Sequence, residues 1–156
     1  MHVIVATDGS KQSLAAAQQL KGFADPAKIT EVSVMAVISP LASVPFANEL
    51  SDPLDRHSDD PTALSFRDEA QAAIEVVAAE FDGWGPKVSR MLRSGSPAAE
   101  IVKVAHEENA ELIVVASGSR GLSDTILLGS TASRVQHSAP CPVLVSRQSR
   151  HTPHNG

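Results

Sequence analysis

The stretch LIVVASGSRGLSDTILLGSTASRVQHSAPCPVLVS, residues 112–146, decides the fold. It opens and closes with short apolar runs, residues 112–116 and 142–145, in which β-branched side chains do not alternate with polar ones. Such runs are typical of strands that are covered on both faces, as in a parallel sheet. A helix from about Ser130 to Ser138, closed by the sequence APCP, is predicted between them. The stretch therefore predicts a strand–helix–strand unit.

Three further strands extend this unit toward the N-terminus. Residues 3–6 and 32–38 form apolar runs of the same kind, and they predict buried strands. Residues 87–93 contain three basic side chains, a charge density that suits an edge strand better than a central one. These side chains are Lys87, Arg90 and Arg93.

Helical spacing fills the segments between the predicted strands. One helix starts near Ser10, the clearest covers about residues 64–82, and a third begins after an N-cap at Ser96 and stops near Asn109. The residues predicted to be buried on these helices are Ala16, Leu20, Phe23 and Ala24, then Phe66, Ala70, Ala73, Ile74, Val77 and Phe81, and finally Ile101, Val104 and Ala105. Strands and helices thus alternate, which predicts an α/β fold, an open five-stranded parallel sheet with helices on both faces.

The length of 156 residues predicts one domain, residues 1–147, followed by a mobile tail at 148–156. Residues 39–62 contain four prolines and several acidic side chains, and they break the pattern after the second strand. They predict a long loop, with a lid over a site and a passive excursion as the open alternatives.

Composition narrows the range of functions. The formal net charge is −5, aromatic residues make up 3% and tyrosine is missing, which argues against binding of DNA or RNA. No apolar run approaches the roughly 18 residues of a membrane span, and the N-terminus does not resemble a signal peptide. The single cysteine, Cys141, fits a reducing compartment and is expected to be a packed small residue. We therefore expect a cytoplasmic protein that associates with neither nucleic acid nor membrane.

Glycine-rich connections follow the first and fourth predicted strands. The first offers Asp8 in a turn, and the second offers Gly118 and Gly121 and then Gly129 and Ser130 at a helix start. In an open parallel sheet, ligands lie at the carboxyl ends of the strands, and a helix N-terminus suits a phosphate. Neither the P-loop nor the dinucleotide glycine pattern is matched. By chemistry alone, phosphate binding and a purely structural set of turns both stay open, and Asp8 could equally cap the first helix.

Three motifs together resemble the universal stress protein family. They are VATDGS at residues 5–10, SGSPAAEIVKVAHEENAELIVVASGSRG at 94–121, and LLGSTASRVQHSAPCPVLV at 127–145. The resemblance extends from residue 3 to residue 147. It implies strand order 3-2-1-4-5, a Rossmann-like fold of the adenine nucleotide alpha hydrolase-like type, and usually a homodimer.

The nucleotide-binding branch of that family carries G-x2-G-x9-G-[ST]. Here seven residues separate Gly121 from Gly129, so the loop is two residues short, and this bears on how far a triphosphate reaches. The resemblance implies that the nucleoside contacts Asp8 and the backbone near Ala6 and Thr7. It also implies that Val37 contacts the adenine and that Gly118, Arg120 and Gly121 contact the ribose and the α-phosphate. The outer phosphates would then contact Gly129, Ser130 and Thr131.

The last predicted strand gives an independent reason to expect a dimer. In the order 3-2-1-4-5 it lies at an edge, yet Val143, Leu144 and Val145 carry no charge. An apolar open edge invites pairing, so we expect an isologous homodimer through these residues.

Three functions remain open from the sequence. The first is a binding module, a stress-response or regulatory protein that holds ATP or AMP, with Mg²⁺ arriving on the phosphates. The second is a slow ATPase, for which no residue is identified as a catalytic base. The third is a nucleotide-free dimer. The histidines show no metal-binding spacing, so no metal site built from protein ligands is expected.

Overall fold

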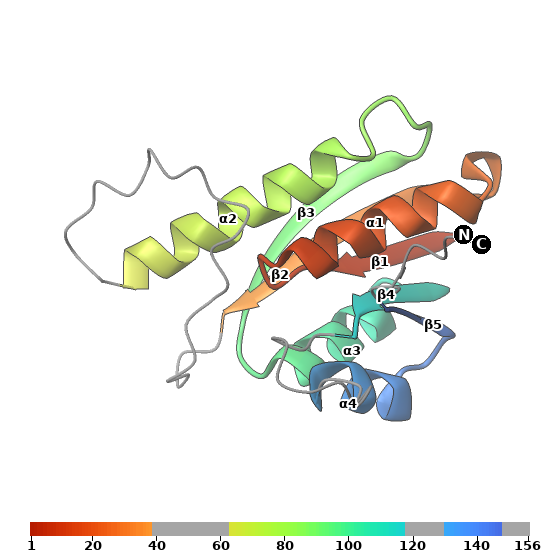
Figure 1. Ribbon diagram of the computed structural model, residues 1–156. Coiled ribbons are helices and arrows are strands. Elements are labelled where there is room, and N and C mark those ends of the chain that lie inside the picture. Colours follow the sequence, from red (N-terminus) through yellow and green to blue (C-terminus); the bar gives the residue numbers. More distant parts are fainter. Residues whose placement is uncertain (39–62, 118–129, 148–156) are drawn as a thin grey trace, which may run out of the picture.

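The computed structural model describes residues 1–38, 63–117 and 130–147, and these form a five-stranded parallel sheet covered by helices (Figure 1). The strands are β1 (His2–Ala6), β2 (Glu31–Ile38), β3 (Lys87–Ser94), β4 (Leu112–Ala116) and β5 (Val143–Ser146). The helices are α1 (Lys11–Phe23), α2 (Ala63–Ala79), α3 (Pro97–Glu107) and α4 (Ser130–Ser138), with a short 3-10 helix at Pro26–Lys28. The strand order β3-β2-β1-β4-β5 confirms the predicted fold class.

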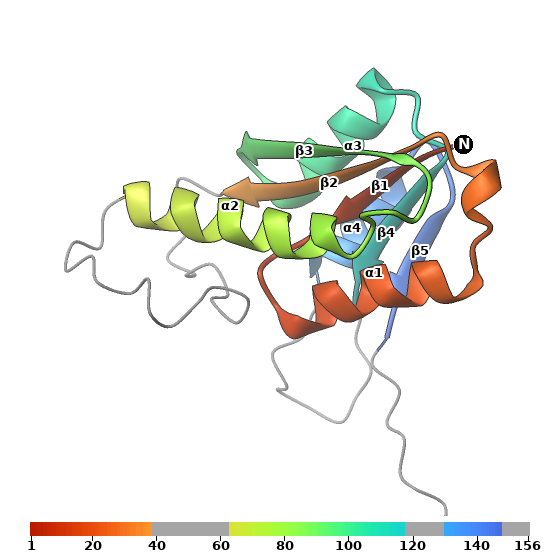
Figure 2. The same ribbon diagram turned by 90° about the horizontal axis from the view of Figure 1, so that it is seen from above.

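Helices α1 and α2 cover one face of the sheet, and α3 and α4 cover the other (Figure 2). Each face has its own buried core. Phe81, Leu20 and Ile74 are the large side chains on the α1–α2 side, whereas Ile4, Met35 and Ile113 lie on the α3–α4 side. The sheet is therefore buried on both faces, which explains why its strands read as continuous apolar runs.

Period-two alternation along the strands assigns each residue to a face. On β2, Val32 and Val34 pack under α1 and α2, whereas Met35 and Val37 pack under α3 and α4. On β1 the same rule places Ile4 and Ala6 on the α3–α4 face, since both pack in that core. The polar residues at the starts of these strands follow this alternation and so share the α3–α4 face.

Most predicted helix ends are confirmed. Ser10 is the N-cap of α1, where its hydroxyl accepts from the Ser13 N–H at 3.2 Å. Asn109 has φ of 52°, the left-handed conformation typical of a residue just after a helix. Ser96 is the N-cap residue of α3, but its side chain makes no capping hydrogen bond.

Two phenylalanines depart from the predicted buried stripes. Phe23 is 65% exposed because it is the last residue of α1, and the next residue, Ala24, packs on the core instead. Phe66 is 37% exposed and lies in the first turn of α2, and among residues 66–70 Ala70 is the first buried one. Cys141 is half-buried and packs against the α3–α4 core, and burial raises the pKa of its thiol.

Within the described ranges, none of the helices has the length and apolar character needed to cross a lipid bilayer. The predicted loop at residues 39–62 and the predicted tail at 148–156 lie outside the described residues.

Candidate functional site

The topology identifies where a ligand would meet this sheet. From β1 the chain proceeds outward to β2 and β3 on one side, and it then continues with β4 and β5 on the other side of β1. The strand order therefore reverses between β1 and β4, and ligands of open α/β sheets bind outside the carboxyl ends of the strands at such a point. Three predicted site residues, Ala6, Thr7 and Asp8, lie at or just after the end of β1.

A hydrogen-bonded turn leaves β1 at this position. The Thr7 N–H donates to the Met35 carbonyl at 2.9 Å, which continues the pairing with β2 beyond Ala6. The buried Thr7 hydroxyl lies 2.7 Å from the Ser13 hydroxyl and accepts from the Gly9 N–H at 3.2 Å. Gly9 has φ of 81°, a conformation that favours glycine. The turn is thus held from β1 on one side and from α1 on the other.

Asp8 is the exposed residue of this turn. Its Oδ1 accepts from the Ser10 N–H at 3.0 Å and also from the Ser10 hydroxyl. Asp8 therefore lies two residues before the N-cap and supports the residue that caps the helix. The carboxylate is thereby oriented at the end of the sheet while its surface stays accessible to solvent.

Val37 and the start of α4 supply the other described residues of the predicted set. Strand β2 continues to Ile38, past Met35, which is the register partner of Ala6. The half-buried Val37 therefore borders the space in front of β1, on the α3–α4 face. Ser130, exposed, and Thr131, half-buried, are the first two residues of α4, where backbone N–H groups have no partner within the helix.

The remaining predicted contacts fall outside the described residues. These are Gly118, Arg120, Gly121 and Gly129. The structure thus places Ala6, Thr7, Asp8 and Val37 around the carboxyl end of β1, and it places Ser130 and Thr131 at the start of a helix that packs against α3 and β5.

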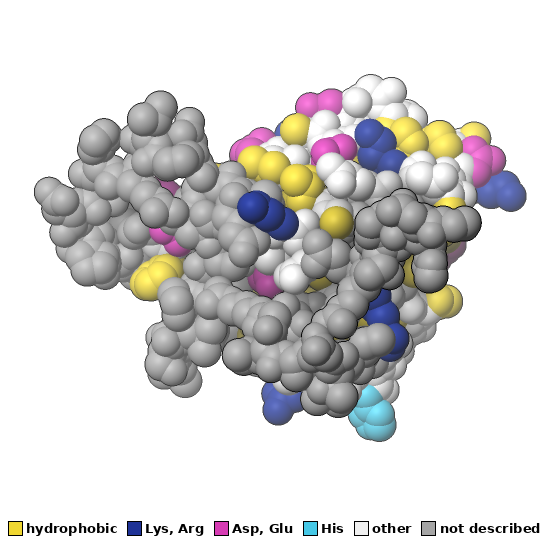
Figure 3. All heavy atoms as spheres, viewed as in Figure 1, with side chains coloured by type: hydrophobic (Ala, Val, Ile, Leu, Met, Phe, Trp, Pro, Cys, Tyr) yellow, Lys and Arg dark blue, Asp and Glu magenta, His cyan; other side chains and the backbone are white. Residues whose placement is uncertain are grey.

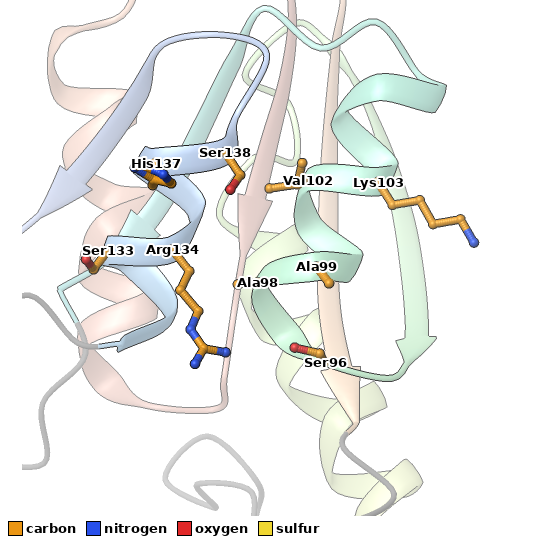
Figure 4. A pocket seen from close by; sticks show the side chains of 9 residues that line it. All are labelled: Ser96, Ala98, Ala99, Val102, Lys103, Ser133, Arg134, His137 and Ser138. Atoms are coloured by element: carbon orange, nitrogen blue, oxygen red, sulfur yellow. The ribbon is translucent and has the colours of Figure 1, made fainter.

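A separate groove of about 610 Å³ lies between α3 and α4 (Figure 4). None of the predicted nucleotide-binding residues lines it. Its charged or titratable lining residues are Lys103, Arg134 and His137, and the Lys103 side chain extends away from α4. On the face seen in Figure 3, the cationic side chains of the described residues lie singly or in small groups beside acidic and apolar ones.

Strand β5, which is predicted to form the dimer, lies at an edge of the sheet. β5 pairs with β4 alone among the described strands, and Val143, Leu144 and Val145 are each half-buried. Leu144 packs toward the α1–α2 core, and the two valines pack toward the α3–α4 core.

The structure brings together a second polar group of residues that the sequence does not predict. His2, Glu31 and Glu108 come together at the amino end of the sheet, although 28 residues separate the first two and 76 the last two. Local histidine motifs cannot reveal this grouping, because its members are far apart in the sequence. The signal that would reveal it is the parallel register, which pairs His2 with Glu31.

Comparison with known proteins agrees with the fold. A family model described as "Universal stress protein family" matches residues 1–147. The universal stress protein MJ0531 of Methanocaldococcus jannaschii is 32% identical over 149 residues, which cover 94% of this chain and 81% of that protein. The solved structure of MJ0577, from the same organism, superposes with a TM-score of 0.74 at 26% identity and covers 96% of both chains.

A more distant structure, the family protein At3g01520 of Arabidopsis thaliana, was solved with AMP bound. It has a TM-score of 0.64 at 18% identity, covering 99% of this chain and 97% of that one. At this identity the likeness shows the shared fold.

Proposed function

The chain belongs to the universal stress protein family, and from that premise we propose that it binds an adenine nucleotide, ATP or AMP, as a stress-response binding module of the cytoplasm. The nucleotide would lie outside the carboxyl ends of β1 and β4. The observation that carries the proposal is the ordered turn after β1, in which Asp8 is exposed and its carboxylate is oriented by Ser10 at the point where the strand order reverses.

The nucleoside end of the ligand would contact Asp8 and the backbone around Val37. A carboxylate is a good acceptor for ribose hydroxyls, and Asp8 already has its direction set by the turn. Val37 continues β2 beyond the end of β1, so the backbone around it offers donors and acceptors to an adenine edge. The AMP-bound relative supports an adenine nucleotide as the ligand class.

The phosphates of the nucleotide would bind at the start of α4. Ser130 and Thr131 combine hydroxyl donors with the free N–H groups and positive dipole of a helix N-terminus. The dipole supplies only about 0.3–2 kcal/mol, so several donors must act together. The sequence motif adds Gly118, Arg120, Gly121 and Gly129 to this set, and Mg²⁺ would be held mainly by phosphate oxygens.

Calorimetric titration of the protein with Mg-ATP and, separately, with AMP tests the proposal. We expect saturable heat at one nucleotide per chain. AMP binding as tight as ATP binding would show that the shortened glycine loop does not engage the outer phosphates. No heat from either ligand up to about 1 mM, equivalent to a binding free energy weaker than roughly −4 kcal/mol, would contradict the proposal and favour the nucleotide-free dimer.

A matched pair of aspartates makes the test specific. Asp25, like Asp8, accepts a backbone N–H two residues ahead at 3.0 Å, but it lies between α1 and β2, at the other end of the sheet. Asp8→Ala and Asp25→Ala each remove a carboxylate that accepts a backbone N–H, and Asp8→Ala also removes the acceptor of the Ser10 hydroxyl. We expect Asp8→Ala to weaken nucleotide binding at least tenfold, which is about 1.4 kcal/mol, and Asp25→Ala to leave it within about twofold. Equal effects of the two substitutions would contradict a direct contact between Asp8 and the nucleotide.

We further propose that the protein is a homodimer paired through β5. The β4–β5 ladder uses the carbonyls of Pro142 and Ser146, which accept from Ile113 and Ser117 at 3.1 and 2.8 Å. The alternation of a parallel ladder therefore turns the N–H groups of Val143 and Val145 toward the open edge.

Val145→Pro removes one outward N–H and preserves the ladder to β4. Sedimentation should show a dimer for the wild type and a monomer for the variant, with circular dichroism showing that the variant is folded. A wild-type monomer, or a folded variant that stays dimeric, would contradict pairing through this strand.

A further inference from the structure

The amino end of the sheet carries a polar cluster on its α3–α4 face, which we call the amino-end cluster, made of His2, Glu31, Ser33, Ser89 and Glu108. Parallel register brings together residues that are far apart in sequence. His2 is opposite Glu31 and Ser33 is opposite Ser89. Glu108 is the C-cap residue of α3, which runs antiparallel to the strands and so ends over their beginnings.

Three side chains of this cluster converge on one point. The His2 Nε2 lies 3.4 Å from the Glu108 Oε2 and 3.7 Å from the Glu31 Oε2. One ligand atom from each of the three residues lies within 4.8 Å of the other two. The three side chains are 16%, 26% and 28% exposed for His2, Glu31 and Glu108, so the group is largely shielded but open to solvent on one side.

The Ser33 hydroxyl has more hydrogen-bond partners in this cluster than it has protons to donate. The Ser33 hydroxyl is fully buried and lies 2.7 Å from the His2 Nε2, 3.3 Å from the Glu31 carboxylate and 3.2 Å from that of Glu108. It is also 2.9 Å from the Ser89 hydroxyl, which itself donates to Glu31. A hydroxyl has one proton to give, so Ser33 can donate to only one of the two carboxylates at a time.

The cluster places two carboxylates beside one imidazole. Lys87 also approaches, with its ammonium 3.9 Å from the Glu31 Oε1, but its side chain is 75% exposed.

We propose that His2, Glu31 and Glu108 bind a divalent transition-metal ion of the zinc class, a site distinct from the nucleotide site. With Zn–N and Zn–O bonds of about 2.1 Å, a tetrahedral ion sets its ligand atoms about 3.4 Å apart. The separations of 3.4 and 3.7 Å from the His2 Nε2 are near that edge, and the third separation, between the two carboxylates, is within 4.8 Å. Ser33 and Ser89 donate to the carboxylates of Glu108 and Glu31 at 3.2 and 2.9 Å, as outer partners of metal ligands do.

The ligand chemistry favours zinc over magnesium. An imidazole nitrogen suits Zn²⁺ and its neighbours in the first transition row, whereas Mg²⁺ prefers oxygen ligands in octahedral geometry and keeps its waters. Three protein ligands leave a fourth position for water or a further ligand, which the partly open cluster permits.

Competition between the protein and a chromogenic chelator for Zn²⁺ tests the proposal. The protein should carry no affinity tag, and a reductant without metal-binding thiols should keep Cys141 reduced. The background variant H151A/H154A removes a pair of histidines at residues 151 and 154, three apart in sequence, whose binding could be mistaken for the site. We expect one tightly bound Zn²⁺ per chain, and Co²⁺ in its place should give the visible absorption of a tetrahedral complex.

The variants separate the site from adventitious binding. His2→Ala and Glu108→Gln should each weaken Zn²⁺ binding on the order of 100-fold or more, and Ser89→Ala should weaken it about tenfold, at the lower end of the range for an outer partner. His106→Ala and Glu111→Gln remove exposed residues of the same types near the same helix end, and they should change the affinity less than twofold. Thermal melting with EDTA present shows whether each variant is folded.

The proposal is overturned if the wild type binds Zn²⁺ no more tightly than the folded Glu108→Gln variant. It is also overturned if the two control variants lose as much affinity as the cluster variants. Because no nucleotide is present in this experiment, its result is independent of whether the carboxyl end of the sheet binds ATP or AMP.

Discussion

The two ends of the sheet build polar sites in different ways. At the carboxyl end of β1, Thr7, Asp8 and Ser10 are close in sequence, and their hydrogen bonds run mostly within one turn. At the amino end, His2, Glu31 and Glu108 meet only because two strands pair in register and a helix ends above them. One site is local and can be recognised as a motif, whereas the other exists only in the folded sheet.

This difference has an energetic consequence. A local turn keeps some of its geometry while the surrounding core loosens, because its bonds close short loops. A site assembled across strands loses its geometry as soon as the strands separate. We therefore expect the amino-end cluster to depend on the sheet more strongly than the turn at Asp8 does.

The largest effect should come from the core that both ends share. Ile113 is fully buried in β4, lies opposite Ile4 and Val143, and belongs to neither polar group. Ile113→Ala should lower the free energy of unfolding by about 2–5 kcal/mol, as measured by urea denaturation. While the variant is folded, nucleotide and Zn²⁺ titrations should both keep their wild-type stoichiometry. Loss of nucleotide binding alone, or of Zn²⁺ binding alone, would show that the two ends of the sheet do not depend equally on this core.

Thr7→Val should affect the carboxyl end alone. Valine has nearly the shape of threonine but leaves the Gly9 N–H and the Ser13 hydroxyl without the Thr7 oxygen they contact. We expect a loss of about 1–3 kcal/mol in unfolding free energy, together with weaker nucleotide binding and unchanged Zn²⁺ binding.

Ser89→Ala is the corresponding change at the other end of the sheet. It removes the hydroxyl that donates to Glu31 at 2.9 Å, so Zn²⁺ binding should weaken while nucleotide binding stays the same. Crossed effects, in which Thr7→Val changes the Zn²⁺ titration or Ser89→Ala the nucleotide titration, would contradict the independence of the two ends.

The fold could be predicted because its determinants are local or periodic. Unalternating apolar runs gave the strands, and the charges of β3 marked it as an edge. The strand order came from the family resemblance, since composition and periodicity do not specify which strands are neighbours. The predicted burial of Phe23 and Phe66 is wrong, because helical periodicity assigns a face but does not show where along a helix the packed part begins or ends.

Of the two polar sites, only the turn at the carboxyl end of β1 could be predicted from the sequence. Asp8 and Ser10 belong to a turn motif, so their proximity follows from the sequence. The amino-end cluster does not, because its members acquire a common position only through the pairing of His2 with Glu31 and the end of α3 at Glu108. Ordinary metal motifs are recognised by short spacing, and here the spacing carries no information.

The smallest effect should come from Lys87, whose ammonium flanks the amino-end cluster without being part of it. The pair with Glu31 spans 3.9 Å and the lysine is 75% exposed, so Lys87→Gln should change the unfolding free energy by no more than about 0.5 kcal/mol. It also removes a cation that competes for the Glu31 carboxylate. Zn²⁺ binding should therefore tighten slightly, by about two- to threefold at low ionic strength, and the gain should shrink as salt is added. Weaker Zn²⁺ binding in this variant would mean that Lys87 orients Glu31 toward the ion.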